Sequence, residues 1–258
     1  MIVGFCQYDV RYKDIEQNLQ VIETLLRDVK ADIMVLPELA LTGYYFEEKA
    51  SLMSLSKEAI NLNVIERLRK LADARKMTLV IGLSEIEEES LYNTVYVIDQ
   101  RGVVGKHRKI NLTNNETIFT RGETVEVINV NGIKLGIAIC FETWFPEMFR
   151  LLVNKAADLI VCPSNFGGPW TLDVVKVRAL ENSIPVVLCN RLGAETIEGV
   201  LEYFRGESQI IDGYGNCLIK AGSENYVGTF ELDLNAFSRN RSLISDCMVV
   251  EQARYKSK

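Results

Sequence analysis

Three residues far apart in the chain, Glu38, Lys109 and Cys140, carry side chains that together suit thiol chemistry. Glu38 stands in Leu-Pro-Glu-Leu, Lys109 in Arg-Lys-Ile-Asn-Leu and Cys140 in Ile-Ala-Ile-Cys-Phe-Glu. A cysteine nucleophile needs a nearby cation that favours its thiolate and an acid/base group that moves protons. If the fold brings them together, these residues predict a thiol hydrolase.

Each of these residues also has an ordinary structural interpretation. Glu38 alone is typical of a solvated loop carboxylate, Lys109 of a solvated basic face within the run 106–109, and Cys140 of a core position. The single histidine, His107, could serve as the base of a papain-like pair. Its place two residues before Lys109 favours a local structural or rim role, so we expect His107→Ala to remain active.

The hydrophobic pattern predicts a layered α/β protein in which these residues lie at strand ends. A strand over 33–36 stops at Pro37 and places Glu38 at its end, and a hairpin around Asn131-Gly132 ends its second strand at Cys140. Strands are predicted at 2–7, 33–36, 78–83, 91–98, 125–130, 133–140, 158–162, 185–190, 208–212, 217–220 and 226–232. Helices are predicted at 15–29, 64–72, 144–154 and 172–182.

Three separated motifs resemble the nitrilase superfamily of carbon-nitrogen hydrolases, and the resemblance spans most of the chain. They are Leu-Pro-Glu-Leu at 36–39 with Thr-Gly-Tyr at 42–44, Arg-Lys at 108–109 with Leu112, and Gly-Ile-Ala-Ile-Cys at 136–140 followed by Phe-Pro-Glu at 145–147. Similar downstream segments lie at 178–182, 190–193 and 206–212.

The resemblance implies a role for each matching residue. Glu38 corresponds to a general base, Lys109 to a cation that stabilises an oxyanion, and Cys140 to a nucleophile that becomes acylated. Glu116 resembles an additional active-site glutamate, although a surface role is an equal alternative. The implied reaction is amide hydrolysis through a thioester, in the amidase-like branch of the family.

Candidate substrate-binding residues lie beside these motifs: Tyr44, Phe141, Trp144, Asn165 and Phe166. The stretch 144–147, Trp-Phe-Pro-Glu, is similar to that of N-carbamoylputrescine amidases and favours an amide or carbamoyl substrate. A core tryptophan covering the helix start would give the same signal. The loop 164–170 could form a pocket rim or be ordinary loop punctuation.

The family resemblance also implies an architecture and an assembly. The expected fold is a four-layer α-β-β-α sandwich of nitrilase type in a single domain, 1–258. Homodimers or higher homo-oligomers are expected through helices near the nucleophile, with 235–258 as a C-terminal interface arm.

Composition excludes several classes of function. The formal net charge of -6 argues against nucleic acid as a partner, and the six scattered cysteines form no metal-binding motif. No phosphate-binding loop is present, so no cofactor is expected.

The start of the chain lacks a secretion signal and no segment is apolar enough to span a membrane, so we expect a soluble cytoplasmic protein. A nitrilase, or a catalytically silent ligand-binding or partner-binding member of the fold, remains an alternative.

Overall fold

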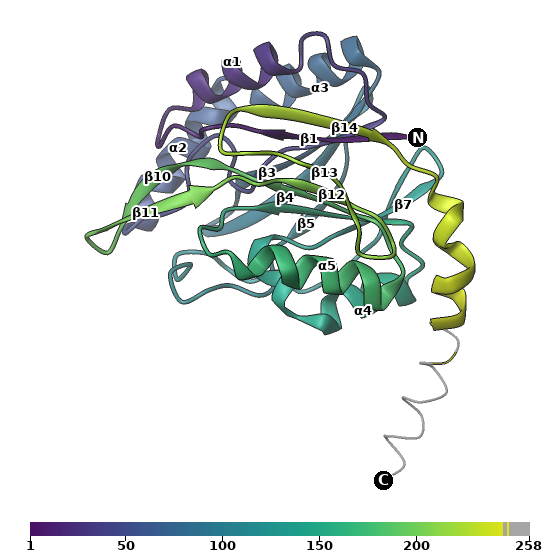
Figure 1. The fold of residues 1–258 in the computed structure, drawn as a ribbon. Helices are drawn as coiled ribbons and strands as arrows, with labels where there is room; N and C mark the ends of the chain where they lie inside the picture. The colour runs from purple at the N-terminus through teal and green to yellow at the C-terminus, as the bar shows by residue number, and fades with distance from the viewer. Residues whose placement is uncertain (245–246, 248–258) are drawn as a thin grey trace.

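Two six-stranded β-sheets form the centre of the protein in a computed structural model that describes residues 1–244 and 247 (Figure 1). The first sheet has the order β14 (Tyr226–Glu231), β1 (Ile2–Gln7), β2 (Ile33–Val35), β3 (Thr78–Glu87), β4 (Ser90–Asp99) and β5 (Gly102–Arg108). The second has the order β13 (Cys217–Lys220), β12 (Gln209–Ile211), β9 (Val186–Asn190), β8 (Leu159–Ser164), β7 (Ile133–Ile137) and β6 (Ile128–Val130).

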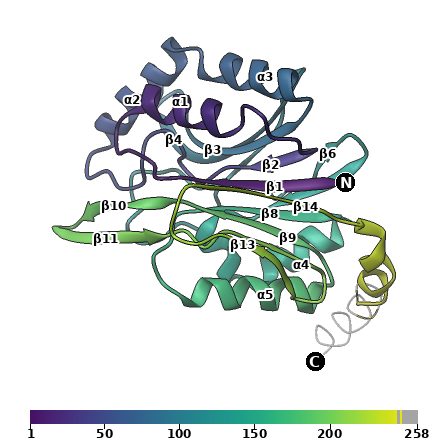
Figure 2. The ribbon, with the colours of Figure 1, turned by 45° about the horizontal axis from the view of Figure 1, so that its top comes forward.

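Helices cover the outer face of each sheet (Figures 1 and 2). The first sheet is covered by α1 (Ile15–Leu25), α2 (Lys49–Asn61) and α3 (Val64–Arg75), and the second by α4 (Pro146–Asn154) and α5 (Trp170–Asn182). The sandwich also carries two short 3-10 helices, η1 (Cys140–Trp144) and η2 (Leu234–Phe237), and the hairpin of β10 (Leu192–Ile197) and β11 (Val200–Arg205). Residues 238–244 continue from η2 as a helix. The expected four-layer α-β-β-α sandwich is confirmed.

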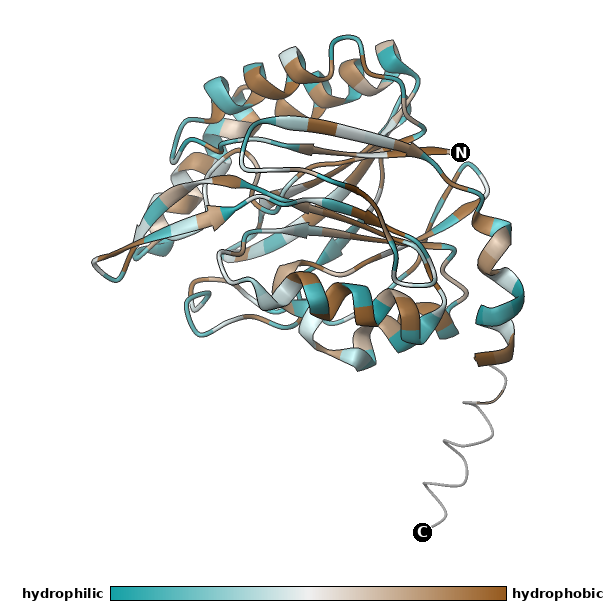
Figure 3. Ribbon diagram, in the orientation of Figure 1, coloured by the Kyte–Doolittle hydropathy of each residue, from teal (hydrophilic) through white to brown (hydrophobic). Residues whose placement is uncertain are grey.

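Alternation along the strands separates two apolar layers. On β1 and β2, Val3, Phe5 and Val35 point into the core between the sheets, whereas Cys6 and Met34 pack under the helices. Successive side chains of a strand point to opposite faces, so strands buried on both sides read as continuous apolar runs. Figure 3 shows this apolar colouring along the central strands.

Several predicted boundaries were wrong. The strand before Cys140 ends at Ile137, and Cys140 instead begins η1. The first helix stops at Leu25, before Val29. Helix α2 escaped prediction because only Leu52 and Ser56 are buried along it. The hairpin β10–β11 escaped because its second strand is mostly exposed and lacks apolar alternation.

The C-terminal arm predicted over 235–258 lies largely outside the described residues. Within the described part, Arg241 donates a hydrogen bond to Asp158 O at 3.3 Å. In the part of the chain that is described, no helix has the length and apolar character needed to cross a membrane.

Candidate active site

Glu38 lies in the loop after β2 and is held against β3. Gly82 N donates to Pro37 O at 3.0 Å, and Ala40 N donates to Gly82 O at 2.8 Å. A Cβ atom on Gly82 would stand 2.5 Å from the Cα of Glu38, so only glycine allows this approach. Glu38 is fully buried, and its interpretation as a solvated loop carboxylate was wrong.

Lys109 follows β5 and points inward, because side chains alternate along the strand. Its Nζ donates to Glu38 Oε1 at 2.6 Å and to Glu116 Oε1 and Oε2 at 2.8 and 2.9 Å. The neighbours Lys106 and Arg108 point the other way and pair with Glu85. The interpretation of this run as a solvated basic face therefore holds for Lys106 and Arg108 but is wrong for Lys109.

Glu116 is buried beside Lys109, so its surface interpretation was wrong. Besides the ammonium of Lys109, its Oε2 accepts a hydrogen bond from Thr113 N at 2.9 Å. Both oxygens of Glu116 are thus occupied. Two carboxylates share one ammonium, and the buried group of three carries a net negative charge when all three are ionised.

Sequence reasoning missed Asn93, which connects the two carboxylates. Its Nδ2 donates to Glu38 Oε1 at 2.7 Å and to Glu116 Oε1 at 3.0 Å. The backbone carbonyl oxygen of Asn93 also accepts a hydrogen bond from Lys109 N at 2.8 Å. Asn93 is fully buried within β4, where a buried amide requires partners, but an asparagine among apolar residues has no distinctive pattern in the sequence.

Cys140 occupies a sharp turn at the start of η1. Its φ of 45° lies in the left-handed region, which is unfavourable for a residue with a Cβ, and the residue is 8% exposed. Thr143 Oγ1 donates to Cys140 O at 2.7 Å and closes the turn. The backbone N–H of Asn165, which follows β8, acts on the thiol and lowers its pKa. The second sheet therefore supplies the candidate nucleophile.

The environment of Cys140 keeps its thiol protonated at neutral pH. Burial raises its pKa well above the ordinary value, and the charge of Glu38 raises it further, whereas Lys109 and the Asn165 N–H lower it by less. Lys109 favours the thiolate, as expected, but burial and the charge of Glu38 outweigh it. The two carboxylates that contact Lys109 also exceed its single positive charge when all three groups are ionised.

Glu38 is arranged to accept a proton. Burial raises its pKa, Lys109 opposes the rise, and Glu116 adds to it. Its Oε1 is occupied by Lys109 and Asn93, but Oε2 is buried and has no hydrogen-bond partner among the described residues. A buried oxygen without a partner is costly, and an incoming thiol or water proton would satisfy it.

The pKa of Lys109 is shifted in the direction that keeps it charged. Burial lowers this pKa, but Glu38 and Glu116 outweigh burial and raise the pKa well above its ordinary value.

Three of the candidate substrate-binding residues lie close to these groups. The Asn165 side chain is 5% exposed, and within residues 1–244 both its Oδ1 and its Nδ2 lack a partner. Phe166 follows it and is buried, with its N–H donating to Asn190 Oδ1 at 2.9 Å. Tyr44 donates to or accepts from Thr113 Oγ1 at 3.1 Å, and its ring lies edge-on to Phe204 at 6.2 Å.

The other two candidates flank the nucleophile turn. Phe141 packs edge-on against Phe145, with ring centroids 5.3 Å apart. Trp144 is 42% exposed, so its interpretation as a core residue was wrong. Of the two roles expected for His107, the local structural one fits and the rim role does not: His107 is buried, and its Nε2 lies 3.0 Å from Glu142 Oε2.

Glu195 fixes the loop that carries Tyr44 and was also missed by sequence reasoning. It accepts hydrogen bonds from Tyr44 N at 3.0 Å and Tyr45 N at 2.9 Å, and it pairs with the fully buried Arg191. Because Arg191 immediately precedes β10 and Glu195 lies within it, this pair joins the hairpin to the loop after β2.

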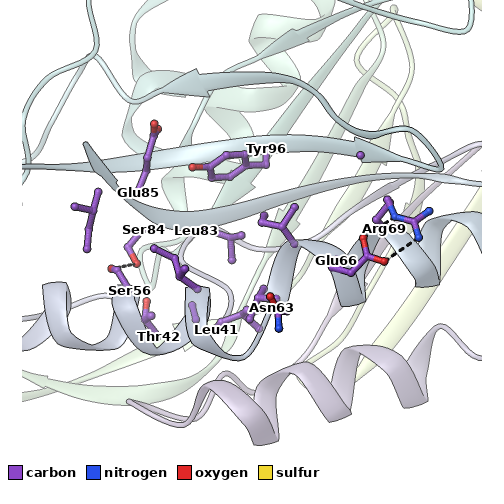
Figure 4. Close-up of a pocket in the computed structure, with 16 residues that line it drawn as sticks. Leu41, Thr42, Ser56, Asn63, Glu66, Arg69, Leu83, Ser84, Glu85 and Tyr96 are labelled. Carbon is purple, nitrogen blue, oxygen red and sulfur yellow. Dashed lines mark hydrogen bonds and ion pairs between the residues drawn. The ribbon is translucent and has the colours of Figure 1, made fainter. Parts of the chain in front are cut away.

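A separate cavity of about 490 Å³ opens on the helix side of the first sheet (Figure 4). It lies between α2, α3 and strands β3 and β4, and Leu41 and Thr42 reach it from the loop after Glu38. Ser56 Oγ and Ser84 Oγ lie 2.6 Å apart in its wall. Its lining includes neither Cys140 nor the charged groups around it, so it is distinct from the candidate active site.

Comparison with known proteins finds relatives along nearly the whole chain. Residues 2–241 match the family model described as carbon-nitrogen hydrolase. A nitrilase of Pyrococcus abyssi is 32% identical over 90% of this chain and 89% of its own length. An N-carbamoylputrescine amidase of Arabidopsis thaliana is 30% identical over 86% of this chain and 83% of its own.

A solved structure supports the same relationship. It is a variant of an amidase from Nesterenkonia sp. AN1 that shows the result of Michael addition of acrylamide at the active-site cysteine. The TM-score is 0.80 at 25% identity, and the match covers 93% of this chain and 97% of that one. The similarity extends over the complete sandwich rather than one layer.

Proposed function

This chain belongs to the carbon-nitrogen hydrolase family, whose members include nitrilases and amidases, and it acts on non-peptide C–N bonds. We propose that it does so as a cysteine-dependent amidohydrolase. The proposed substrate is a small linear amide, an omega-amide or an N-carbamoyl compound, and the nitrogen leaves as ammonia. Glu38, Lys109, Glu116 and Cys140 are the proposed catalytic residues.

In the first stage, Cys140 becomes acylated. Glu38 Oε2 accepts the thiol proton as the sulfur attacks the substrate carbonyl carbon, and a tetrahedral intermediate forms. Lys109 and the backbone N–H of Phe141 stabilise its oxyanion. Glu38 then delivers the proton to the nitrogen, the C–N bond breaks, and ammonia leaves a thioester on Cys140.

In the second stage, water releases the acyl group. Glu38 accepts a proton from water as the oxygen attacks the thioester carbon, and the C–S bond breaks. The sulfur of Cys140 recovers a proton from Glu38, and the product is a carboxylic acid, or a carbamic acid from a carbamoyl substrate. Glu38 ends each cycle ionised, as it began.

The unpartnered Oε2 of Glu38 is the observation that carries this proposal. Lys109 and Asn93 hold the other oxygen, so the carboxylate has one free, buried acceptor in a site that also raises the pKa of Cys140. An ammonium has three hydrogens. Lys109 Nζ contacts one oxygen of Glu38 and both oxygens of Glu116, and when one hydrogen is shared between the two Glu116 oxygens the third hydrogen can turn to an oxyanion.

The buried amide of Asn165 supports direct substrate recognition. Its donor and its acceptor both lack partners among the described residues, and its own backbone N–H lowers the pKa of the Cys140 thiol. A primary amide or a carbamoyl group carries a complementary acceptor and donor. Tyr44 and Phe166 would then form apolar parts of the same pocket, with Phe141 and Trp144 nearer its entrance.

A nitrile is the alternative substrate, favoured by the similarity to the Pyrococcus abyssi nitrilase. The same Cys140 would attack the nitrile carbon. Products separate the two activities, because a nitrilase converts the nitrile itself to acid and ammonia.

The test is ammonia release by the wild type and Cys140→Ala across primary amides, omega-amides, N-carbamoyl compounds and nitriles. We expect loss of at least about a thousandfold in the variant, because the proposed nucleophile is absent. Intact mass of the quenched wild type should show an acyl adduct. Cys217→Ala, which removes an exposed thiol, is the matched control. Undiminished turnover by Cys140→Ala would reject the mechanism, and ligand binding without turnover would favour a catalytically silent member of the fold.

A further inference from the structure

One buried carboxylate, that of Glu142, joins two segments that are distant in sequence. Its Oε1 accepts a hydrogen bond from Ile110 N at 2.7 Å, with Asn111 N farther away at 3.4 Å. Its Oε2 accepts from Ile139 N at 2.7 Å and lies 3.0 Å from His107 Nε2. Glu142 is fully buried, and both of its oxygens are occupied.

These contacts lie immediately beside two proposed catalytic residues. Ile110 follows Lys109, and Ile139 precedes Cys140. Glu142 is also the third residue of η1, and its side chain reaches back to the N–H just before the helix, as in one half of a capping box. It therefore restrains the turn in which Cys140 adopts a positive φ.

We propose that Glu142 is a positioning residue that holds the Cys140 turn in register with the Lys109 segment, and that His107 completes its hydrogen bonding. This inference rests on the proposed function. Among the described residues, the Glu142 carboxylate bonds to backbone N–H groups and His107 rather than to the thiol of Cys140. The two sheets contribute separate parts of the site, and Glu142 fixes one part against the other.

The contacts require an ionised carboxylate of this length. The backbone groups that contact Glu142 are all N–H donors, and an ionised carboxylate accepts hydrogen bonds from such donors more strongly than a neutral group does. Burial raises the pKa of Glu142, but His107 and the N–H groups of Ile139 and Ile110 outweigh it and lower the pKa. A glutamine would direct an NH₂ group against one of these donors, and an aspartate would be too short to reach both segments.

The experiment compares wild type, Glu142→Gln and Glu142→Asp on the best amide of the panel. We expect kcat to fall by about ten- to a hundredfold, because small displacements of reacting groups have effects of this size. KM should stay within about twofold, since the pocket residues are unchanged. The acylation rate in a single turnover should fall in parallel with kcat.

Asp212→Asn is the matched control, because Asp212 is another buried carboxylate that accepts backbone N–H groups, from Tyr214 and Asn216, in a turn of the second sheet. We expect it to lower stability while kcat per folded molecule stays unchanged. An equal loss of kcat in Asp212→Asn, or wild-type kcat in folded Glu142→Gln, would overturn the positioning role.

His107 supplies a second test that leaves Glu142 in place and decides the matter if the Glu142 variants do not fold. A glutamine amide can donate from nearly the position of Nε2, whereas leucine cannot donate. We expect His107→Leu to remain active, since His107 is not the base, but to lose kcat severalfold, and His107→Gln to recover most of that loss. Equal activity in the two variants would count against the proposal.

The two proposals fail in different ways. If Cys140→Ala is as active as the wild type, the proposed function is wrong whatever the Glu142 variants do. If turnover depends on Cys140 but not on Glu142, only the positioning role is wrong.

Discussion

At the scale of single residues, the protonation states of Glu38 and Cys140 determine the expected pH dependence. Glu38 must be ionised to accept the thiol proton, and its pKa is raised by burial in spite of Lys109. As pH falls through this raised pKa, the base becomes protonated and activity is lost. We therefore expect the acid limb of kcat/KM to lie above the ordinary glutamate value of about 4.5.

The thiol of Cys140 determines the pH dependence on the alkaline side. Because the pKa of Cys140 is raised well above its ordinary value, alkylation of free enzyme by iodoacetamide should still increase with pH at pH 8 to 9. Profiles of kcat/KM from pH 4 to 9, with alkylation followed by intact mass, test both limbs. An acid limb at or below 4.5, or a plateau of alkylation near neutral pH, would contradict these protonation states.

Residue types and motifs predicted Glu38, Lys109, Glu116 and Cys140, and the structure places the first three in direct contact. They did not predict Asn93 or Glu142, because an asparagine within an apolar strand and a glutamate after a cysteine have no distinctive pattern of their own. Their importance arises from which backbone groups and carboxylates approach them after folding. Such contacts have high sequence separation, and hydrophobic periodicity carries no information about them.

At the scale of elements, the close approach of β3 to the Glu38 loop predicts a specific effect of Gly82→Ala. The added methyl group would stand within 3 Å of Glu38 Cα, Leu39 N and Pro37 O, all of them backbone atoms. The loop must move away and carry the carboxylate with it. We expect kcat to fall by about tenfold or more, together with a lower Tm.

Gly4→Ala is a control for crowding alone, because its methyl group would meet Met34 Cε and Gly228 O rather than the catalytic loop. It should lower Tm comparably and leave kcat per folded molecule near the wild-type value. If Gly82→Ala loses stability but no activity, the Glu38 loop is not held in place by this contact.

Elements with strong periodicity were predictable, and those without it were not. Strand β1 was predicted with its observed bounds, because both of its faces are buried and it reads as an apolar run. The turn at Cys140 was misread as the end of a strand, since the apolar sequence 137–139 continues past the last ladder pair at Ile137. Helix α2 and the hairpin β10–β11 bury few side chains and so left little pattern to detect.

At the scale of the whole molecule, the candidate site exists only when the two sheets pack together. Glu38, Asn93 and Lys109 belong to the first sheet and its loops, whereas Cys140 and Asn165 follow strands of the second. The resemblance to the nitrilase superfamily implied this architecture, whereas the hydrophobic pattern alone indicated only a layered α/β protein. Substrate identity was beyond such motifs, since it depends on the placement of polar groups and on pocket size.

The outer face of the second sheet predicts self-association of the whole molecule. Along α5, Trp170, Val177 and Leu180 recur at helical spacing and are exposed, and Leu151 on α4 is exposed as well. Figure 3 shows apolar residues along this outer helix. An apolar patch that packs against a second copy would bury these side chains, as in homodimer interfaces generally.

We therefore expect the wild type to be a homodimer in size-exclusion light scattering at micromolar concentration. Replacing both Val177 and Leu180 by lysine should give a monomer, because two charges cannot be buried in such an interface. Ile60→Lys is the control, since Ile60 is comparably exposed but lies on α2, on the opposite side of the sandwich.

Dimerisation should also restrain the turn that carries Cys140, because Arg178 of α5 donates to Thr143 O and Trp144 O at 3.2 Å each and so connects this face to η1. The double variant should thus lose activity as it loses the dimer, and a wild type that stays monomeric would show that this face serves another purpose.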